Sequence, residues 1–428
     1  MSSAMLYTLG IGVVAVCAGM AMSGYRGRTV IVGIDLGTSY SVVAYQDQYT
    51  GKSRVVPCAD NSSQFTTPSV VSYLPGGEVV VGRAAKARWA ADAADTVHNA
   101  KRFLGRPRFD ADALAYAAAH HLATVAAPRG EGERDGDGGE TAPLSGTWFS
   151  IRADGHGGAV APEAVGAAVV RTLLDNVAAH LGHRMVRKAV IAVPAAFDNR
   201  QRAATALAFK QAGIKVARTL DEPVAAALAY ELHRKPGVTH ILVYDFGGGT
   251  LDVSVLFVRE GSVETVASAG DNDLGGSDFD VCLGAHLANQ LPPAAKADSA
   301  CLHEVMAAVE KAKIHLSTHG SVEVEAACGA GGAGGGGAHA DRHALRATPE
   351  SFRAACAAEF ERALSPVAHA LELSYLEKGH IDEVVLVGGS SRIPFIRDAL
   401  RAEFPDAPLN LDLDADLVVA LGAANVID

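Results

Sequence analysis

Two short segments of the 428-residue chain place an aspartate, glycines and a threonine directly after an apolar run. They are residues 33–38 (GIDLGT) and 244–250 (YDFGGGT), which lie about half the chain apart. Glycines allow tight turns that point consecutive backbone N–H groups outward, and the threonine adds a hydroxyl donor, so each loop suits a phosphate. Because Asp35 and Asp245 would repel that phosphate, the loops predict a shared Mg²⁺ that both carboxylates hold through water.

A third glycine cluster, residues 384–394 (VVLVGGSSRIP), follows another apolar run. Glycines after a buried strand let the backbone approach a flat ligand closely, and Arg392 could stack its guanidinium on a purine face. A solvated surface arginine is the alternative interpretation of Arg392. Together with the two phosphate loops, the cluster favours a purine nucleotide as the ligand.

The elements that must position these loops can be predicted from hydrophobic patterning. Apolar, β-branched runs bounded by Gly, Pro or Asp predict buried strands over residues 30–34, 189–193, 241–244 and 384–387. Longer alanine-rich stretches predict helices over residues 162–181, 201–212, 225–232, 302–316 and 350–376. This alternation indicates an α/β fold, and the matched aspartate loops predict two similar lobes that face each other.

The composition is that of a globular protein, with 49% hydrophobic and 20% charged residues. A net charge of −11 gives no electrostatic drive toward nucleic-acid phosphates, which disfavours nucleic acid as a partner. The six cysteines are far apart and form no Cys-x-x-Cys pair, so no zinc or redox motif is predicted. We expect buried free thiols, because cysteine packs as a small hydrophobic residue.

Residues 1–28 are predicted to be a hydrophobic signal peptide or signal anchor. Residues 5–22 are uncharged and mostly apolar, a length between that of a signal-peptide core and that of a short membrane anchor. Small residues around Ala21 permit cleavage, whereas Arg26 and Arg28 favour a cytosolic orientation for the downstream chain. Contact with a membrane is expected only through this segment.

Two segments have the composition of linkers. Residues 128–146 are rich in glycine and charge, and residues 329–337 contain seven glycines. Neither can bury enough surface to offset the entropy of ordering, so both are predicted to be insertions on the surface.

Several motifs, taken in order along the chain, resemble the nucleotide-binding domain of the seventy-kilodalton heat-shock family. They are the Asp35 and Asp245 loops, residues 99–105 (NAKRFLG), 193–197 (VPAAF) and 221–227 (DEPVAAA), and the glycine cluster at 388–392. The resemblance implies an actin-like ATPase fold with two ribonuclease-H-like lobes, four subdomains and ATP in the central cleft. Residues 29–428 are then expected to form one nucleotide-binding domain.

The resemblance also implies roles for individual residues. Asp35, Asp245 and Asp252 would organise Mg²⁺ and its waters. Lys101 and Glu222 would position the attacking water and balance charge on the γ-phosphate. The residues implied to contact ATP or ADP are Gly37, Thr38, Ser39, Tyr40, Gly248, Gly249, Thr250, Glu310, Lys313, Ser317, Gly389, Ser390, Arg392 and Asp416.

One position departs from the family's pattern. Where well-known members place a second arginine against the adenine, this chain has Ile314. An apolar contact then replaces one cation–π contact, a loss of order 1 kcal/mol, or several-fold in affinity.

The resemblance implies a slow ATP hydrolase of the chaperone type. Because the chain stops soon after Gly422, we expect no peptide-binding domain, as in the microsomal branch of the family that consists of the ATPase core. The expected location is the endoplasmic reticulum, with the lumenal side favoured. The expected state is a monomer that binds co-chaperones, nucleotide-exchange factors or ubiquitin-like proteins.

Two alternative functions stay open. The first is a nucleotide-dependent interaction scaffold with negligible hydrolysis, which Ile314 favours and the intact Lys101 and Glu222 disfavour. The second is a sugar or acetate kinase of the same superfamily. A kinase would need an acceptor pocket with a general-base aspartate, and no sequence feature predicts one.

Overall fold

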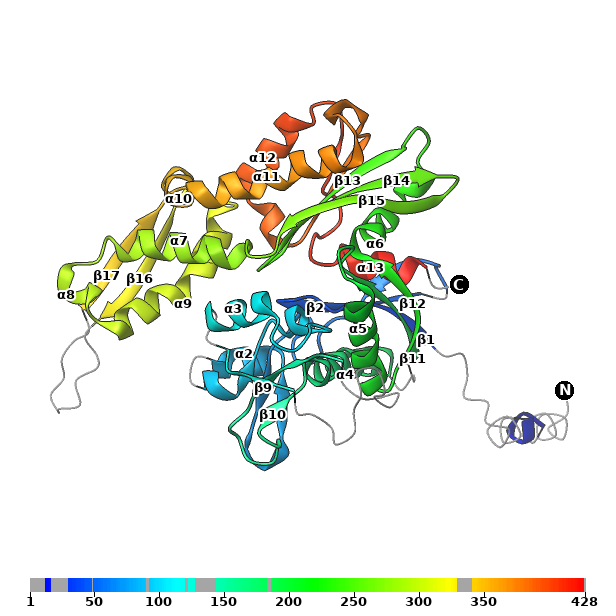
Figure 1. Cartoon of the computed structure of the whole chain (residues 1–428), viewed down its shortest axis with the longest axis horizontal. Helices are drawn as coiled ribbons and strands as arrows, with labels where there is room; N and C mark the ends of the chain where they lie inside the picture. Colours follow the sequence, from blue (N-terminus) through cyan, green and yellow to red (C-terminus); the bar gives the residue numbers. More distant parts are fainter. Residues whose placement is uncertain are drawn as a thin grey trace, which may run out of the picture.

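The computed structural model describes eight stretches of the chain (Figure 1), namely residues 12–16, 30–47, 49–89, 92–119, 122–127, 144–182, 186–328 and 341–426. The predicted leader, residues 1–28, lies outside these stretches except for the helical residues 12–16. Most of the predicted insertion at 128–146, and all of that at 329–337, also lie outside them. Among the described residues, no helix combines the length and the apolar composition needed to cross a bilayer.

The first lobe is built on a mixed sheet whose central strand leads into the first aspartate loop. In spatial order its strands are β12 (Lys215–Asp221), β11 (Val186–Val193), β1 (Val30–Asp35), β2 (Tyr40–Gln46) and β3 (Ser53–Val55). β1 pairs parallel with β11 and antiparallel with β2. A short strand, β4 (Thr67–Pro68), pairs with β2 outside this order.

The second lobe repeats this arrangement. In spatial order its strands are β19 (Leu409–Asn410), β18 (Glu383–Val387), β13 (His240–Phe246), β14 (Leu251–Arg259) and β15 (Ser262–Asp271). β13 pairs parallel with β18 and antiparallel with β14, as β1 does with β11 and β2. Both aspartate loops therefore connect the central strand of a sheet to its antiparallel neighbour. The prediction of two similar lobes is confirmed, and the fold is the actin-like ATPase fold.

Helices cover the sheets and join the lobes. In the first lobe they are α4 (Pro162–Leu181) and α5 (Asn199–Gln211), which pack on each other. α4 has a proline at its first turn and ends at Gly182, whose φ of 82° suits a left-handed C-cap. α11 (Ala357–Ser374) packs on β14 and β15 in the second lobe, next to α12 (Pro394–Glu403).

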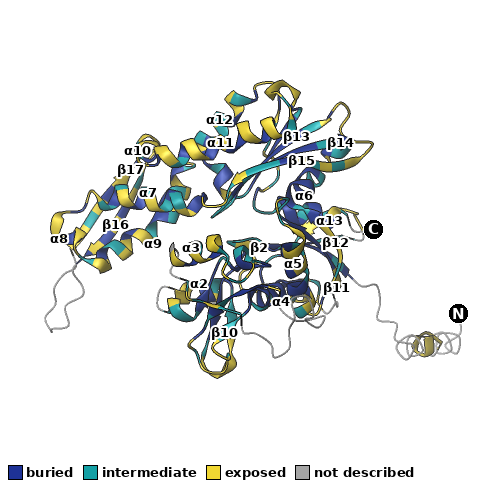
Figure 2. Ribbon diagram, viewed as in Figure 1, coloured by how far each residue is buried: buried dark blue, intermediate teal, exposed yellow. Residues whose placement is uncertain are grey.

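Two central helices, α6 (Glu222–Ala229) and α13 (Val418–Asn425), connect the sheets. A Cβ atom added at Gly422 of α13 would lie 1.7 Å from the carbonyl oxygen of Ala225, so only glycine allows this contact between the helices. Apolar residues from α6, α13 and strands of both lobes form one buried cluster, separate from the core of each lobe. Figure 2 shows the buried residues along the sheets and this junction.

Each lobe has an outer part. In the first lobe it consists of β5 (Val71–Tyr73), β6 (Val79–Val81), β7 (Thr96–Val97), β8 (Thr124–Ala126), β9 (Thr147–Ser150), β10 (Ala159–Val160), α2 (Arg83–Trp89) and α3 (Ala111–Ala119). In the second lobe it consists of α7 (Gly276–Ala288), α8 (Pro293–Lys296), α9 (Ser299–Leu316), β16 (Val322–Cys328), β17 (Asp341–Ala347) and α10 (Pro349–Ala355). Figure 1 shows this second outer part extending away from β13–β15.

The predicted strands and helices are all present, with ends that differ by at most three residues, and one predicted helix is divided in two. The predicted helix 225–232 begins earlier, at Glu222, and ends at Ala229. The predicted helix 350–376 is wrong as one element, because Cys356 leaves helical geometry (φ −110°, ψ 30°) and separates α10 from α11. The side-chain pattern continues through this break, which explains why the sequence predicts one long helix.

The expectation of free thiols is wrong for four of the cysteines. Cys282 is bonded to Cys356 and Cys301 is bonded to Cys328, whereas Cys58 is free and buried. The partners are 74 and 27 residues apart in sequence. No local spacing signals such pairs, and the tertiary fold alone brings their Cα atoms to 5.4 and 4.7 Å.

Candidate functional site

The two predicted phosphate loops face each other across the interface between the lobes. A Cβ atom added at Gly248 would lie 2.5 Å from Ser39 Oγ, so the second loop touches the first. Within the first loop, a Cβ at Gly37 would lie 2.0 Å from the carbonyl oxygen of Tyr40. Gly37 is therefore required for the turn of the first loop, and Gly248 is required for the close approach of the second loop to the first. The structure brings together Gly37, Thr38, Ser39 and Tyr40 with Gly248, Gly249 and Thr250.

Lys101 and Glu222 form a buried ion pair at this site. Lys101 lies in a short 3₁₀ helix, η3 (Ala100–Phe103), and Glu222 is the first residue of α6. Lys101 Nζ lies 2.5 Å from Glu222 Oε1, with the side chains only 9% and 11% exposed. Burial alone would lower the pKa of Lys101, but the carboxylates of Glu222 and Asp35 raise it above its ordinary value. The lysine is therefore charged and held in one position.

Three aspartates surround this pair. Asp35 ends β1, and Asp245 on β13 lies directly opposite Asp252 on β14. Burial, with the nearby charge of Glu222, raises the pKa of Asp35 to about 7 and that of Asp252 to about 6. Burial and the charges of Glu222, Asp252 and Asp35 hold the pKa of Asp245 well above its ordinary range.

These carboxylates fit a divalent cation. Four carboxyl groups converge on one lysine, so the ionised cluster carries more negative than positive charge. Burial and this excess negative charge together raise the pKa values of the three aspartates, and a bound cation would relieve both effects. Oxygen ligands of this kind suit Mg²⁺, with Asp35 and Asp245 as the predicted partners.

Two of the predicted nucleoside contacts lie on α9, and Ser317 caps that helix. Lys313 Nζ lies 2.8 Å from Asp280 Oδ1 on α7 and donates to the carbonyl oxygen of Gly276 at 2.7 Å. Glu310 forms an ion pair with Lys86 of α2. Ser317 Oγ donates to the carbonyl oxygen of Lys313 within its own helix. The Lys313 contacts fix α9 against α7, and the Glu310–Lys86 pair fixes α9 against the first lobe.

The third glycine cluster lies beside the second phosphate loop. Gly389, Ser390 and Arg392 belong to the 3₁₀ helix η6 (Gly389–Arg392), and Ser390 Oγ donates to the carbonyl oxygen of Gly247 at 2.8 Å. Arg392 pairs with Asp414 and, at 2.8 Å, with Asp416. Burial raises the pKa of Asp416 although Arg392 lowers it. The loop before α13 thus sets the orientation of Arg392.

Two residues that sequence reasoning missed connect the lobes. Lys86 Nζ donates to Tyr40 Oη at 2.8 Å as well as pairing with Glu310. Arg102 donates to the carbonyl oxygen of Gly249 in the second phosphate loop, and its guanidinium lies 4.2 Å from the Tyr116 ring centroid. The position of Arg102 next to Lys101 is a signal that could have identified it. Nothing in the local sequence identifies Lys86.

Gly275 and Gly276, which sequence reasoning also missed, join α7 to the second phosphate loop. A Cβ at Gly275 would lie 2.2 Å from the backbone nitrogen of Gly249, and Gly276 N donates to the carbonyl oxygen of Gly247. A glycine pair at the start of a helix is the sequence signal that could have identified them.

Known proteins with similar sequences cover nearly the whole chain. Residues 31–427 match the family model described as Hsp70 protein. The chaperone protein DnaK of Deinococcus radiodurans is 38% identical over 398 residues, which cover 92% of this chain and 58% of that protein. The DnaK of Cyanidioschyzon merolae is 37% identical over 399 residues, with 92% and 61% covered. That of Guillardia theta is 37% identical over 398 residues, with 92% and 59% covered.

The chain spans about three-fifths of the length of these relatives. The matched residues include both lobes, both phosphate loops and the Lys101–Glu222 pair. Sequence similarity of this extent, together with the repeated sheet order, establishes the family. The chain belongs to the Hsp70 family.

Proposed function

We propose that the chain binds ATP and ADP with Mg²⁺ and slowly hydrolyses ATP, as the nucleotide-binding part of a chaperone-type protein. The observation that carries this proposal is the buried Lys101–Glu222 ion pair, which lies among three aspartates beside two facing phosphate loops. Family membership supports the same reading.

The residues divide the work of hydrolysis between binding and positioning. The backbone N–H groups of residues 37–40 and 248–250 bind the phosphates. Asp35 and Asp245 would hold Mg²⁺ through water, and when bound it would supply positive charge that offsets the charge of the phosphates. Lys101, held by Glu222, orients the attacking water and places positive charge near the γ-phosphate. Phosphoryl transfer needs little covalent chemistry from the protein, so this positioning is the main contribution.

Phosphate release from the full chain tests the proposal. Lys101→Ala should reduce turnover by about a hundred-fold or more, because removing one preorganised electrostatic group has that order of effect. Its affinity for ATP should change much less, since the phosphate loops stay intact. Lys188→Ala, on the exposed side of β11, is the matched control and should release phosphate like the parent.

A nucleotide-binding scaffold with negligible hydrolysis is the second candidate. Ile314 is 61% exposed, and Arg392 is committed to Asp414 and Asp416, so neither is arranged to clamp a purine tightly. If the parent and Lys101→Ala bind ATP but both release phosphate only at the background rate, the scaffold function replaces hydrolysis.

We propose that the nucleotide state is read by partner proteins at the surface near Arg202. Arg202 pairs with Asp221 at 2.9 Å and donates to the carbonyl oxygen of Ala195 at 3.1 Å. Asp221 directly precedes Glu222, so a shift of the Lys101–Glu222 pair would move Arg202. Co-chaperones, exchange factors or ubiquitin-like proteins are the partners we expect for a monomer. Identical partner sets captured by the ATP- and ADP-loaded chains would contradict this.

The apolar residues 5–22 lead us to propose a location at the endoplasmic reticulum, with the domain on the lumenal side. The chain would then be related to Stch, the microsomal ATPase core of the family. Exposed Asn61, in Asn61-Ser62-Ser63, offers a reporter, since lumenal exposure makes it a glycosylation acceptor. If the parent carries a glycan that a glycosidase removes, and Asn61→Gln lacks that added mass, the lumenal side is supported. Protease sensitivity of the domain in intact microsomes would contradict it.

A further inference from the structure

The Cys282–Cys356 disulfide lies at the junction between the outer and inner parts of the second lobe. Cys282 is in the middle of α7, and Cys356 is the residue at which α10 ends and α11 begins. α10 packs on α7 in the outer part, whereas α11 packs on β14 and β15 of the inner sheet. The bond therefore fixes α7 to the point where the chain crosses from one part to the other.

α7 starts at the second phosphate loop. Gly276 N donates to the carbonyl oxygen of Gly247 at 3.0 Å, and Ser277 N donates to that of Gly248 at 2.9 Å. The same helix holds α9 through the Asp280–Lys313 ion pair of 2.8 Å. A change in the tilt of α7 would thus move the phosphate loop and the predicted nucleotide contacts of α9 together.

Aromatic packing connects the disulfide to this loop. The carbonyl oxygen of Phe279 lies 3.4 Å from Cys282 Sγ and 3.9 Å from Cys356 Sγ. The Phe279 ring packs against Phe246, one residue before the phosphate-loop glycines, and against Phe360 of α11, with centroids 5.9 and 4.7 Å apart. The disulfide and the loop therefore share one buried neighbour.

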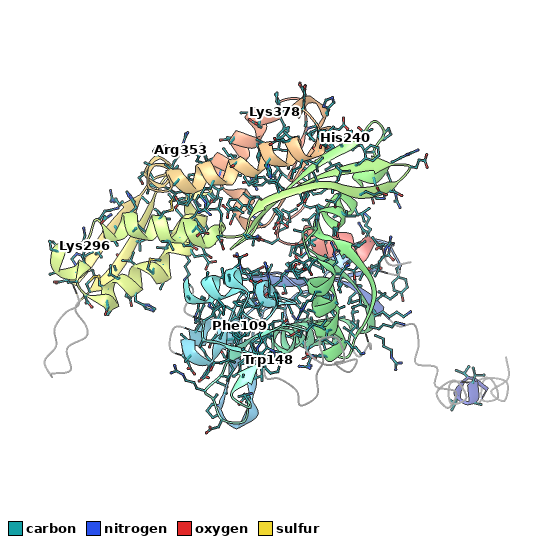
Figure 3. The ribbon with its side chains drawn as sticks, viewed as in Figure 1. Phe109, Trp148, His240, Lys296, Arg353 and Lys378 are labelled. Atoms are coloured by element: carbon teal, nitrogen blue, oxygen red, sulfur yellow. A yellow bond between two sulfur atoms is a disulfide. The ribbon has the colours of Figure 1, made fainter. Side chains whose placement is uncertain are left out.

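A second contact crosses the same junction. Arg353, labelled on α10 in Figure 3, lies with its guanidinium carbon 4.2 Å from the ring centroid of Phe395 on α12. The junction is thus already packed before Cys356 is considered, and the disulfide adds a covalent restraint to a surface on which the two parts meet.

We propose that Cys282 and Cys356 form a thiol–disulfide modification site that controls the release of nucleotide, an inference that rests on the proposed function. The oxidised pair holds α7 against the α10–α11 junction and keeps α9 over the bound nucleotide. The reduced pair lets the outer part turn away, so that nucleotide leaves faster.

The reaction partner is a low-molecular-weight disulfide. The Cys282 side chain, on a partly exposed residue, is the entry point, whereas Cys356 is fully buried. Cys282 thiolate attacks the small disulfide and expels one thiol, and Cys356 thiolate then attacks Cys282 Sγ and expels the second. One S–S bond forms in the protein and one breaks in the reagent, and the two electrons and two protons end on the released thiols.

The Cys301–Cys328 disulfide provides a matched control within the same lobe. It joins the first turn of α9 to the end of β16, inside the outer part, and does not reach the α10–α11 junction. A variant that lacks the Cys301–Cys328 disulfide loses one disulfide of the second lobe but keeps the Cys282–Cys356 bond that holds α7.

The test measures dissociation of a fluorescent ADP analogue from the full chain, reduced with dithiothreitol or oxidised with glutathione disulfide. Alkylation and mass spectrometry establish which cysteines are bonded. The oxidised parent should release ADP roughly five-fold or more slowly than the reduced parent, the lower range of coupling between sites. Cys282→Ser and Cys356→Ala should release it at the fast rate in both conditions, and Cys301→Ala should keep the redox dependence.

Equal rates for the oxidised and reduced parent, or a redox effect that survives in Cys282→Ser, would overturn the proposal. If the reduced parent binds no ADP, the proposed function fails, and amide hydrogen exchange of residues 349–374 tests the site independently. Exchange there should slow on oxidation of the parent but not of Cys282→Ser.

A metal site is the alternative outcome. Glu359 offers a carboxylate within 4.8 Å of both sulfurs. Zinc retained by the reduced parent and protecting it from oxidation would also overturn the proposal, in favour of a metal site.

Discussion

Lys86 Nζ on α2 lies 3.2 Å from Glu310 Oε2 on α9, so an ion pair joins the outer parts of the two lobes. Lys86 also donates to Tyr40 Oη at 2.8 Å, next to the first phosphate loop. Glu310 is one of the predicted nucleotide contacts, and its position therefore depends on both lobes. If nucleotide binds between the lobes, as proposed, separation of the outer parts during its release would break this pair.

Replacing Lys86 by alanine should speed nucleotide release by a few-fold. The side chains of the pair are 39% and 47% exposed, and exposed ion pairs are worth about 0–1 kcal/mol, so a larger effect is not expected. Stopped-flow dissociation of ADP measures the rate. Arg342→Ala, which breaks the exposed Arg342–Glu325 pair between β16 and β17, is the control and should leave the rate unchanged.

Replacing Gly422 by alanine should destabilise the domain. Alanine in a helix is favoured over glycine by about 1 kcal/mol, but its Cβ would lie 1.7 Å from the carbonyl oxygen of Ala225. Backbone cannot move aside cheaply, so the overpacking loss of about 1–3 kcal/mol or more should dominate the free energy of unfolding. Thermal unfolding should show a lower midpoint for Gly422→Ala. Gly320→Ala, where a Cβ meets nothing within 4 Å, should unfold like the parent.

The buried aspartates predict a pH dependence of the nucleotide-free protein. Burial raises the pKa of Asp35 to about 7, from an ordinary value of about 4. Between these values the folded state binds more protons than the unfolded chain, so this group's contribution to the free energy of unfolding falls as pH rises. Asp35→Asn should therefore gain stability over the parent from pH 5 to pH 8, by a few kcal/mol at most.

Urea unfolding in the presence of a chelator, at several pH values, measures this difference. Mg²⁺ should reduce it, because a cation beside Asp35 stabilises the carboxylate. A stability difference that does not vary with pH would show that Asp35 ionises normally in the folded protein.

Replacing Ile314 by arginine should tighten adenine-nucleotide binding. Ile314 is 61% exposed and follows Lys313 on α9, so a longer side chain fits without disturbing the core. A cation–π contact worth about 1 kcal/mol would raise the affinity several-fold. Calorimetric titration with ADP measures the change. Val281→Arg, equally exposed on α7, should leave the affinity unaltered, and an equal gain in both variants would point to charge alone.

The sequence alone determined the local features of this protein. Residues 33–38 and 244–250 predict their turns because glycine and aspartate act within a few residues, and α4 is predicted to its last residue because Pro162 and Gly182 mark its ends. The two-lobed fold followed from the repeat of these loops. Each of these signals depends only on residues that are close together in the sequence, so it can be recognised without knowing how the rest of the chain folds.

Only the tertiary structure decided which distant residues meet. Lys86 reaches Glu310, Arg102 reaches Gly249, and Cys282 reaches Cys356 across 74 residues. None of these pairs has a fixed spacing, because each depends on how whole helices and lobes pack. The raised pKa of Asp35 likewise comes from burial and from Glu222, a distant residue in sequence. Composition and spacing identify the groups that can do chemistry, whereas packing sets their partners and their charge.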